Sequence, residues 1–418
     1  MKHILLIGFS LFPYLLPAQQ SITLEQCRQA AEDNFPLNEQ SAYLQDITDA
    51  QLLKINALWQ PKLYLNAQAT YQSDVTGIPI SFPGIEIPEL SKDQYKASID
   101  FNQVLYDGGA TAQQKAVANE QLLVEQQKVT VDRYKVLDKV NQLYMAVLMA
   151  NIRMEMATVT LAEIGNYKAL AEVSRQYGTA SDMQVLEFQS EMMKLEQQII
   201  EIRHLRLAAI EGLKVLTGLQ IDEYASFTTP SAELITTTIA RPELELFSRQ
   251  RAVFELQRNF AEAPNQPTIS LFAQGGYGRP GLNMLVDSFA FYYIGGIKLS
   301  YPLWTGNTRK RDASIYAANS AITTLQELQF RQSINLQTAQ YQQDIIKLEQ
   351  QIAVDDSIVV LRNMLFQGAT VQFEQGAVST REVIAYLHDH KDAMLARSIH
   401  ELQLLATKVN YLNTLGQH

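Results

Sequence analysis

Cysteine and histidine are scarce in this sequence, with one cysteine and six histidines among 418 residues. The single cysteine, Cys27, excludes a disulfide framework and a zinc site built from cysteines. We expect it to be a small apolar residue on a helix. Basic residues are also few, since 34 Lys and Arg stand against 44 Asp and Glu and give a net charge of −10. A general nucleic-acid binder normally has a basic excess, so this class is disfavoured.

Motifs of catalysis are missing as well. The sequence contains no Walker motif, no G-x-S-x-G elbow and no H-E-x-x-H helix,. The glycine-rich residues 275–281 lie in a predicted strand and its loop, which is not the strand-to-helix position of a dinucleotide site. His388 and His390 are two positions apart on a predicted helix and point in different directions, so we expect a solvated face. The sequence therefore predicts no enzyme, no cofactor and no metal site.

A long apolar run is absent after the N-terminus, so no transmembrane helix is predicted. The N-terminus itself has Lys2, an apolar run from Ile4 to Leu16, and Ala18 as a small residue for cleavage. This order predicts a secretory signal peptide over residues 1–18, because the run is short for a span of about 20 residues. An exported chain of this kind is secreted, periplasmic or part of an outer-membrane β-barrel, whose strands need only about 10 alternating residues.

An internal repeat organises the rest of the chain. Residues 60–72 match residues 266–278 at an offset of 206, and residues 99–108 match residues 297–306 at an offset of 198. One insertion of eight residues explains the change of offset. A unit of about 180 residues is far longer than the repeats of solenoid proteins, so one large module is duplicated.

Each repeat has the same order of elements: a helical stretch, two strands, a long helix, a turn with glycine and a second helix. The first repeat, residues 19–218, has strands at about 61–73 and 94–106 and helices at about 109–177 and 181–217. The second repeat, residues 241–418, has strands at about 267–279 and 288–301 and helices at about 306–375 and 379–415. Helical stretches at 24–58 and 242–263 precede the strands, and residues 219–240 connect the repeats.

The strands alternate between apolar and polar residues. Leu63, Leu65 and Ala67 share one face of the first strand, while Lys62 and Asn66 share the other,. A membrane barrel and a soluble sheet with one buried face both give this pattern. Four strands cannot close a pore, and an open sheet edge is excluded from lipid. If the strands lie in a membrane, several protomers must share one barrel, and a trimer would supply twelve strands.

The two long helices predict coiled-coil packing. Between Gly109 and Tyr177 the only Gly or Pro is Gly165, and Val136, Val140 and further apolar residues step by four and three,. At 1.5 Å per residue such a helix reaches on the order of 100 Å. Helices of this length must pack on neighbours.

Two turns with glycine separate the long helices from the helices that follow. Gly178 and Gly376 suit the left-handed position that closes a helix. Ser181 with Gln184, and Ser379 with Glu382, form capping boxes that open the next helix. A tip that only joins two helices explains these residues completely. An exposed tip that docks a partner hairpin explains them equally well.

Several local motifs, in this order, resemble the TolC family of outer-membrane efflux proteins. They are T-L-E-Q-C-R-Q-A-A-E-D-N-F-P from Thr23, L-Y-D-G-G from Leu105, R-P-E-L from Arg241 and P-L-W-T-G-N-T from Pro302. The two Gly-x-x-Ser turns complete the set. The resemblance covers essentially the whole mature chain.

The resemblance implies an α+β membrane protein and a homotrimer. Four strands per protomer would form a twelve-stranded β-barrel in the outer membrane of a Gram-negative-type bacterium. The long helices would form a periplasmic α-barrel. The implied function is the exit duct of a tripartite efflux or type I secretion system, conducting substrate passively from a periplasmic adaptor and an inner-membrane pump. The tip residues that would face the adaptor are Gly178, Thr179, Ser181, Gly376, Ala377 and Ser379.

The chain departs from the family pattern at the predicted entrance. Members often have an acidic residue six positions after each tip glycine, and those positions are Gln184 and Glu382 here. Both are entrance-lining candidates, but only the second keeps the acid. Some members have a basic residue where this chain has Val378. An alternative function is a periplasmic adaptor or a structural coiled-coil protein, although adaptors usually have one hairpin flanked by small β-domains.

The predicted topology can be tested at the longer strand connection. Residues 73–92 join two strands and contain several Gly and Pro, so we expect an extracellular loop, with residues 281–287 as its shorter counterpart. An epitope tag inserted beside Gly84 should bind antibody on intact cells. Binding only after permeabilisation of the outer membrane would contradict this topology.

Overall fold

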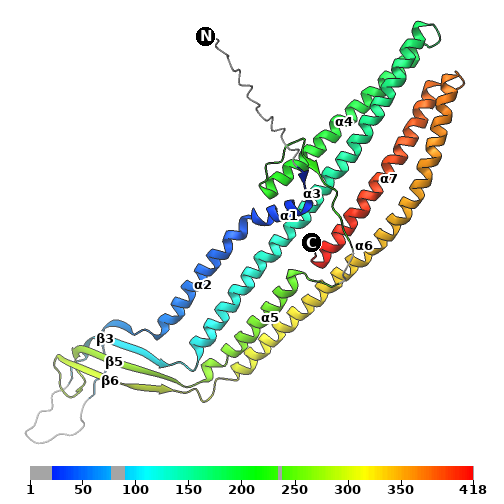
Figure 1. The fold of residues 1–418 in the computed structure, drawn as a ribbon. Coiled ribbons are helices and arrows are strands. Elements are labelled where there is room, and N and C mark those ends of the chain that lie inside the picture. Colours follow the sequence, from blue (N-terminus) through cyan, green and yellow to red (C-terminus); the bar gives the residue numbers. More distant parts are fainter. Residues whose placement is uncertain (1–20, 77–89, 234–237, 418) are drawn as a thin grey trace, which may run out of the picture. The chain divides into compact units, whose positions relative to one another are not determined.

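The computed structural model describes residues 21–76, 90–233 and 238–417 (Figure 1). The predicted signal peptide lies outside these residues, and so does the position of the proposed epitope tag. The chain forms two compact units. The strand unit consists of Glu39–Val129 and Glu243–Gln329, and the helical unit consists of the segments up to Asn38, Thr130–Pro242 and from Phe330 onward.

The strand unit contains one antiparallel sheet of four strands. The strands are β2 (Lys62–Tyr71), β3 (Asp93–Tyr106), β5 (Thr268–Arg279) and β6 (Ala290–Ser300). Their order is β2-β3-β5-β6, so the two repeats meet where β3 pairs with β5. Figure 1 shows the four strands side by side. Strands β2 and β6 lie at the two edges.

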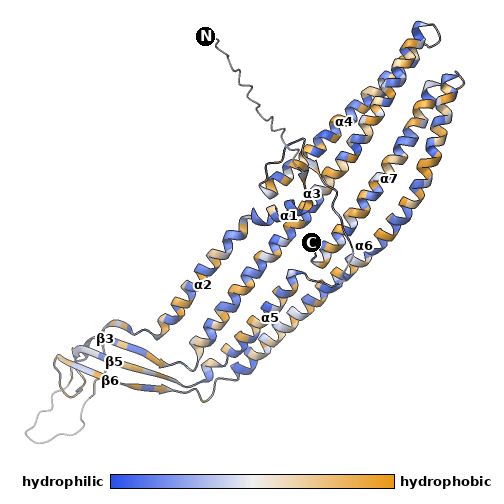
Figure 2. Ribbon diagram, in the orientation of Figure 1, coloured by the Kyte–Doolittle hydropathy of each residue, from blue (hydrophilic) through white to orange (hydrophobic). Residues whose placement is uncertain are grey.

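Apolar and polar residues alternate along the strands (Figure 2), and the strand register puts them on opposite faces of the sheet, as predicted. Leu65 pairs with Ile99, and Tyr277 pairs with Phe291, on the apolar face. Leu65 is 80% and Phe291 is 87% exposed in the single chain. Because large apolar side chains gain free energy when they leave water, this face requires an apolar environment.

Short connections anchor the sheet to the helices of its own unit. The Asp107 carboxylate accepts hydrogen bonds from the Gly109 N–H at 2.9 Å and the Thr111 N–H at 2.7 Å. It thereby caps helix α3 (Ala110–Gln176) directly after β3. Gly108 has a φ of +69°, and a Cβ there would lie 2.4 Å from the Cβ of Gln266. Only glycine fits this close approach of the two repeats.

The other helices of the strand unit are α2 (Gln40–Asn56), α5 (Pro242–Phe260) and the first part of α6 (Thr308–Glu374). Short 3-10 turns at Ala57–Trp59 and Ala263–Asn265 lead into β2 and β5. Arg249 pairs with Glu120 at 3.4 Å, and Arg251 pairs with Glu327 at 2.5 Å. These ion pairs connect α5 with both α3 and α6.

The helical unit combines the remaining parts of α3 and α6 with α1 (Leu24–Asp33), α4 (Asp182–Thr217) and α7 (Thr380–Leu415). A parallel pair of short strands, β1 (Ser21–Ile22) and β4 (Ser226–Phe227), lies beside them. Tyr144 is fully buried, and its hydroxyl donates to the Thr228 carbonyl at 2.6 Å. Cys27 is also fully buried, and burial raises the pKa of its thiol to about 11. It is a core residue, as expected.

The duplication is visible in the helix lengths. Helices α3 and α6 each have 67 residues, and α4 and α7 each have 36. The bounds of these helices and of the four long strands lie within two residues of those predicted. The predicted helical stretch over residues 24–58 consists of α1 and α2, which are separated by a 3-10 turn at Pro36–Glu39. Proline lacks the N–H for a helix bond and disfavours helix in the residue before it.

Helix α3 contains one window that is long and apolar enough to cross a membrane, by length and composition alone. No such window is predicted from the sequence. Val140, Tyr144 and Val147 of this helix are fully buried among α1, α4 and β4. Only 28% of the apolar window is buried within the chain, so packing inside the helical unit covers a minor part of it.

Candidate functional site

The first helical tip joins α3 to α4. Gly178 has a φ of +75°, and its N–H donates to the Arg175 carbonyl at 3.0 Å. The N–H of Thr179 donates to the Ser174 carbonyl at 2.9 Å, which completes a Schellman motif,. The Thr179 hydroxyl also donates to the Ser174 carbonyl at 2.9 Å. The backbone of this tip is thereby closed by its own hydrogen bonds.

The second tip, between α6 and α7, repeats this geometry. Gly376 has a φ of +74° and donates to the Phe373 carbonyl at 2.9 Å. The N–H of Ala377 donates to the Gln372 carbonyl at 2.8 Å. A Cβ at Gly376 or at Gly178 would meet nothing within 4 Å. Backbone conformation, rather than lack of space, therefore requires glycine at both tips.

Both predicted capping boxes are present. The hydroxyl oxygen of Ser181 accepts from the Gln184 N–H at 3.4 Å, and the Gln184 side chain accepts from the Ser181 N–H at 2.9 Å. Glu382 accepts from the Ser379 N–H at 2.7 Å and from its hydroxyl at 2.8 Å. These hydrogen bonds, first that of the backbone, hold the pKa of Glu382 below its ordinary value. Both side chains therefore serve as caps, and an entrance-lining role stays a prediction.

Polar contacts hold the two hairpins of the helical unit together. Arg381 of α7 lies 3.5 Å from Glu187 of α4, close to both tips. Further along, Lys391 of α7 pairs with Glu163 of α3 at 2.7 Å. These residues could not be predicted from the sequence, because no local pattern marks partners about 200 positions apart.

An aromatic cluster lies between the same hairpins. Phe188 of α4 is fully buried and stacks on Tyr167 of α3, with ring centroids 6.0 Å apart. Phe373 of α6 contacts both rings edge-on, at 6.1 and 6.3 Å. The Tyr167 hydroxyl lies 3.1 Å from the Thr370 hydroxyl. This cluster gives the two hairpins a common apolar core directly behind the tips.

The predicted solvated face at His388 and His390 is wrong. His388 is partly buried, and its Nε2 lies 3.0 Å from Glu191 of α4. His390 is buried and stacks on Phe366, and burial holds its pKa below the ordinary value. The two rings do point apart, but toward two different helices. Among the described residues no group of three or more His, Cys, Asp or Glu could hold a metal ion.

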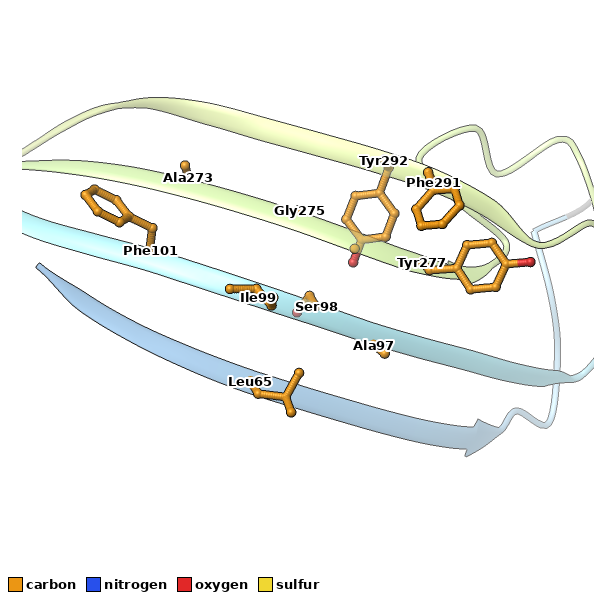
Figure 3. Close-up of a pocket in the computed structure, with 11 residues that line it drawn as sticks. Leu65, Ala97, Ser98, Ile99, Phe101, Ala273, Gly275, Tyr277, Phe291 and Tyr292 are labelled. Carbon is orange, nitrogen blue, oxygen red and sulfur yellow. The ribbon is translucent and has the colours of Figure 1, made fainter.

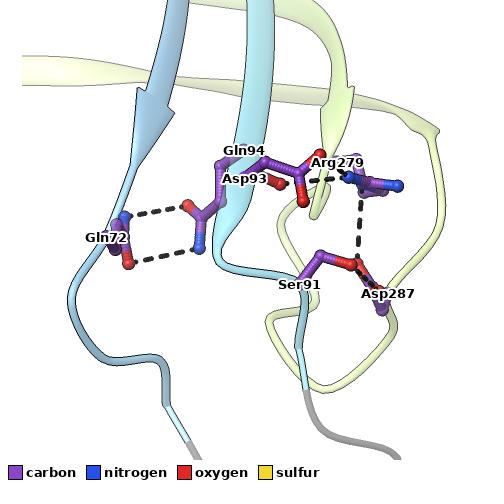
Figure 4. A network of polar contacts seen from close by, with 6 residues as sticks. All are labelled: Gln72, Ser91, Asp93, Gln94, Arg279 and Asp287. Carbon is purple, nitrogen blue, oxygen red and sulfur yellow. Dashed lines mark hydrogen bonds and ion pairs between the residues drawn. The ribbon is translucent and has the colours of Figure 1, made fainter.

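The sheet carries a second set of ordered polar contacts where its strands enter the outer connections (Figure 4). Arg279 pairs with Asp93, and it lies 3.7 Å from Asp287. Ser91 donates to Asp287 at 2.5 Å. The network connects the loops of both repeats and fixes this end of the sheet.

A shallow depression of about 630 Å³ marks the apolar face of the sheet (Figure 3). Leu65, Ile99, Phe101 and Phe291 point into it from three strands. Small residues, such as Ala97 and Ala273, form its floor. A flat apolar surface of this kind suits acyl chains better than a polar ligand.

The family model of outer membrane efflux proteins matches residues 27–219 of the chain. These residues span the first predicted repeat and include its strands, both of its helices and the tip at Gly178. The first repeat is therefore similar to outer membrane efflux proteins. A search among curated proteins found no match.

Solved structures of outer membrane channels have the fold of the whole chain. The outer membrane protein VceC of Vibrio cholerae is 16% identical, with 94% of this chain and 96% of that chain covered and a TM-score of 0.66. The CmeC channel of Campylobacter jejuni is 12% identical, with 100% and 94% covered and a TM-score of 0.64. The open MtrE channel of Neisseria gonorrhoeae is 13% identical, with 94% and 89% covered and a TM-score of 0.65.

These matches confirm the family resemblance and the α+β fold built from a duplicated strand-helix module. The family is one of outer-membrane efflux channels and not of enzymes, so the predicted class of function and the predicted outer-membrane localisation are confirmed. The tip and entrance roles of individual residues stay predictions.

Removal of one cap tests the structural part of the tips. Ser379→Ala deletes the acceptor for the Glu382 N–H and should cost about 1 kcal/mol of local stability. Ser379→Thr keeps a hydroxyl and is the matched control. Hydrogen exchange of the amides at the start of α7 measures both variants. Equal protection in Ser379→Ala and in the unchanged protein would contradict the capping role.

The same cap predicts a pH dependence. Because the pKa of Glu382 is lowered in the folded tip, its contribution is complete above the ordinary glutamate pKa of about 4.3. The contribution is lost as the pH falls through the lowered folded value. Exchange protection of the second tip should therefore decrease in acid, and Glu382→Gln should remove this component while the first tip, capped by Gln184, lacks it.

Proposed function

We propose that three copies of this chain form one channel through the outer membrane. Each copy contributes four strands to a twelve-stranded barrel, and the long helices form an α-barrel in the periplasm. The channel passively conducts substrate that a periplasmic adaptor and an inner-membrane pump deliver. Efflux and type I secretion both use an exit duct of this kind.

The sheet with its two open edges carries this proposal. Strands β2 and β6 each pair on one side only among the described strands. Backbone N–H and C=O groups cannot lie unpaired in lipid, while the exposed apolar face fits a lipid environment. Pairing of β6 with β2 of the next copy satisfies both conditions, because neighbouring strands alternate in direction around the sheet.

Apolar residues along the helices support assembly as well. Helix α6 exposes a series of large apolar side chains, among them Ile315, Leu325, Leu336, Val354 and Leu365. Leu336 is 72% exposed in the single chain. Soluble monomers rarely leave long apolar series uncovered. Neighbouring copies in the trimer would cover them.

The tips are the proposed contact with the adaptor. Thr179 and Ala377 are exposed, and their side chains are not needed to close either tip. The hydrogen bond of the Thr179 hydroxyl duplicates one that its own backbone already makes. Side chains at these two positions are therefore available to a partner.

The alternative, a periplasmic adaptor or a structural coiled-coil protein, has less support. It does not explain the duplicated module or the apolar sheet face. Solubility separates the two functions. An adaptor or coiled-coil protein needs no detergent to leave the outer membrane, whereas the channel should be extracted by detergent as a trimer that resists mild heating.

Arginine substitutions on the two faces of the sheet test the barrel. Leu65→Arg or Phe291→Arg places a charge toward lipid and should cost about 2–4 kcal/mol near the middle of the membrane. The matched variant Asn66→Arg faces water and should be milder. The yield of assembled trimer in outer membranes is the measurement. Equal losses on the two faces would exclude a lipid-facing barrel.

A double substitution at the tips tests docking. Thr179→Glu with Ala377→Glu places bulky charges beside the two tip glycines without removing a cap. The trimer should persist, while transport and cross-linking to the adaptor should be lost together. Ser379→Ala is compared with it as a variant that weakens a cap and adds no charge to the tip. Normal transport and normal cross-linking in a stable double variant would contradict the docking role.

A further inference from the structure

The charges of the sheet are divided unequally between its faces. On the apolar face the only charged residues of the four long strands are Asp93 and Arg279, and they pair with each other at the loop end. The polar face carries three lysines, Lys62, Lys96 and Lys298, and one carboxylate, Asp100. Three positive charges and one negative charge give this face a net charge of +2, although the net charge of the whole chain is −10.

The single carboxylate is already surrounded by donors. The Asp100 side chain accepts from Gln274 at 2.5 Å, from Ser98 at 3.3 Å and from Asn66. Strands β2, β3 and β5 thus each supply one donor. A carboxylate bound in this way has few lone pairs left to coordinate a passing cation.

Within the residues that the structure describes, no carboxylate forms an ion pair with Lys62, Lys96 or Lys298. All three are exposed. They lie at two levels, because Lys96 pairs across the sheet with Gln68 near the outer connections, whereas Lys62 and Lys298 are close to the strand ends that adjoin the helices.

Lys96, the lysine near the outer connections, is held in a defined position. The Lys96 ammonium lies 5.1 Å from the centroid of the Tyr292 ring. Tyr292 is only 9% exposed because it covers Gly276, where an added Cβ would lie 2.4 Å from the ring. Lys96 and Tyr292 line a hollow of about 240 Å³ whose only other charged residue is Arg279, which Asp93 neutralises.

We propose that the lumen of the barrel prefers anions, so that the exported substrate is an anionic or acidic molecule. The inference rests on the proposed trimer, in which the polar face encloses the water-filled lumen. Rings of Lys or Arg are the usual means of anion selectivity in pores. Low-dielectric walls concentrate the field of such rings and enrich the counter-ion. Two basic levels with one occupied carboxylate between them form this arrangement.

Permeability ratios in planar bilayers test the proposal. Purified trimer is placed in a potassium chloride gradient of about 0.1 M against about 0.01 M, where the Debye length is about 10 to 30 Å. The chloride-to-potassium permeability ratio should exceed one. It should approach one in salt of about 1 M, where screening reduces the Debye length to about 3 Å.

Matched lysine variants separate the barrel from the rest of the channel. Lys62→Gln, Lys96→Gln and Lys298→Gln together should lower the ratio by about tenfold, the lower end of enrichment in charge-lined clefts. The same three positions changed to Arg keep the charge and should keep the ratio. Asp100→Asn should raise it. In vesicles, an anionic dye should pass faster than a cationic dye of similar size, and the Gln variant should lose this difference.

The outcomes distinguish the two proposals. A wild-type ratio below one in low salt, or equal ratios for the Gln and Arg variants, overturns the anion preference and leaves the channel function intact. Trimers that form no channels overturn the proposed function, and the anion preference with it.

Discussion

The outer edges of strands β2 and β6 expose backbone groups that no other described strand of the chain pairs with. In water this is an ordinary feature of a sheet, but in lipid each unpaired N–H or C=O costs several kcal/mol. The edges and the apolar face therefore make opposite demands on a single copy. The apolar face is more stable in lipid than in water, whereas the unpaired edges are less stable in lipid. In the proposed trimer, closure with other copies removes the conflict, and insertion and assembly then belong to one process.

The long elements could be predicted from the sequence because their periodicity is strong. Between Gly109 and Tyr177 there is one glycine, and it breaks neither the helix nor the spacing of its apolar residues. Each of the four long strands is marked by the alternation of apolar and polar residues. Elements with a weak or short sequence pattern could not be predicted. The break at Pro36 follows from proline chemistry, yet the pattern on both sides of it is helical. The strands β1 and β4 have two residues each, which is too few for any period to appear.

The tips could be predicted from local sequence, whereas the contacts behind them could not. Gly178, Gly376 and their capping serines act within a few residues, so local sequence determines them. The contact between Tyr167 and Thr370, and that between Glu163 and Lys391, join positions more than 200 residues apart. No local pattern distinguishes such residues from other residues on a helix face. Only the fold brings His388 and His390 to different neighbours.

The closed backbone of the tips has a consequence for evolution. Glycine and the capping box fix each turn, so selection can replace the exposed residues between them without loss of the fold. Duplication has already used this freedom, because Thr179-Ala180 in one tip corresponds to Ala377-Val378 in the other. If the tips dock the adaptor as proposed, one gene encodes two recognition surfaces on the same scaffold. Each can drift toward a different partner, and a lineage can acquire a new transport system by a few substitutions at positions whose side chains are not needed to close the turn.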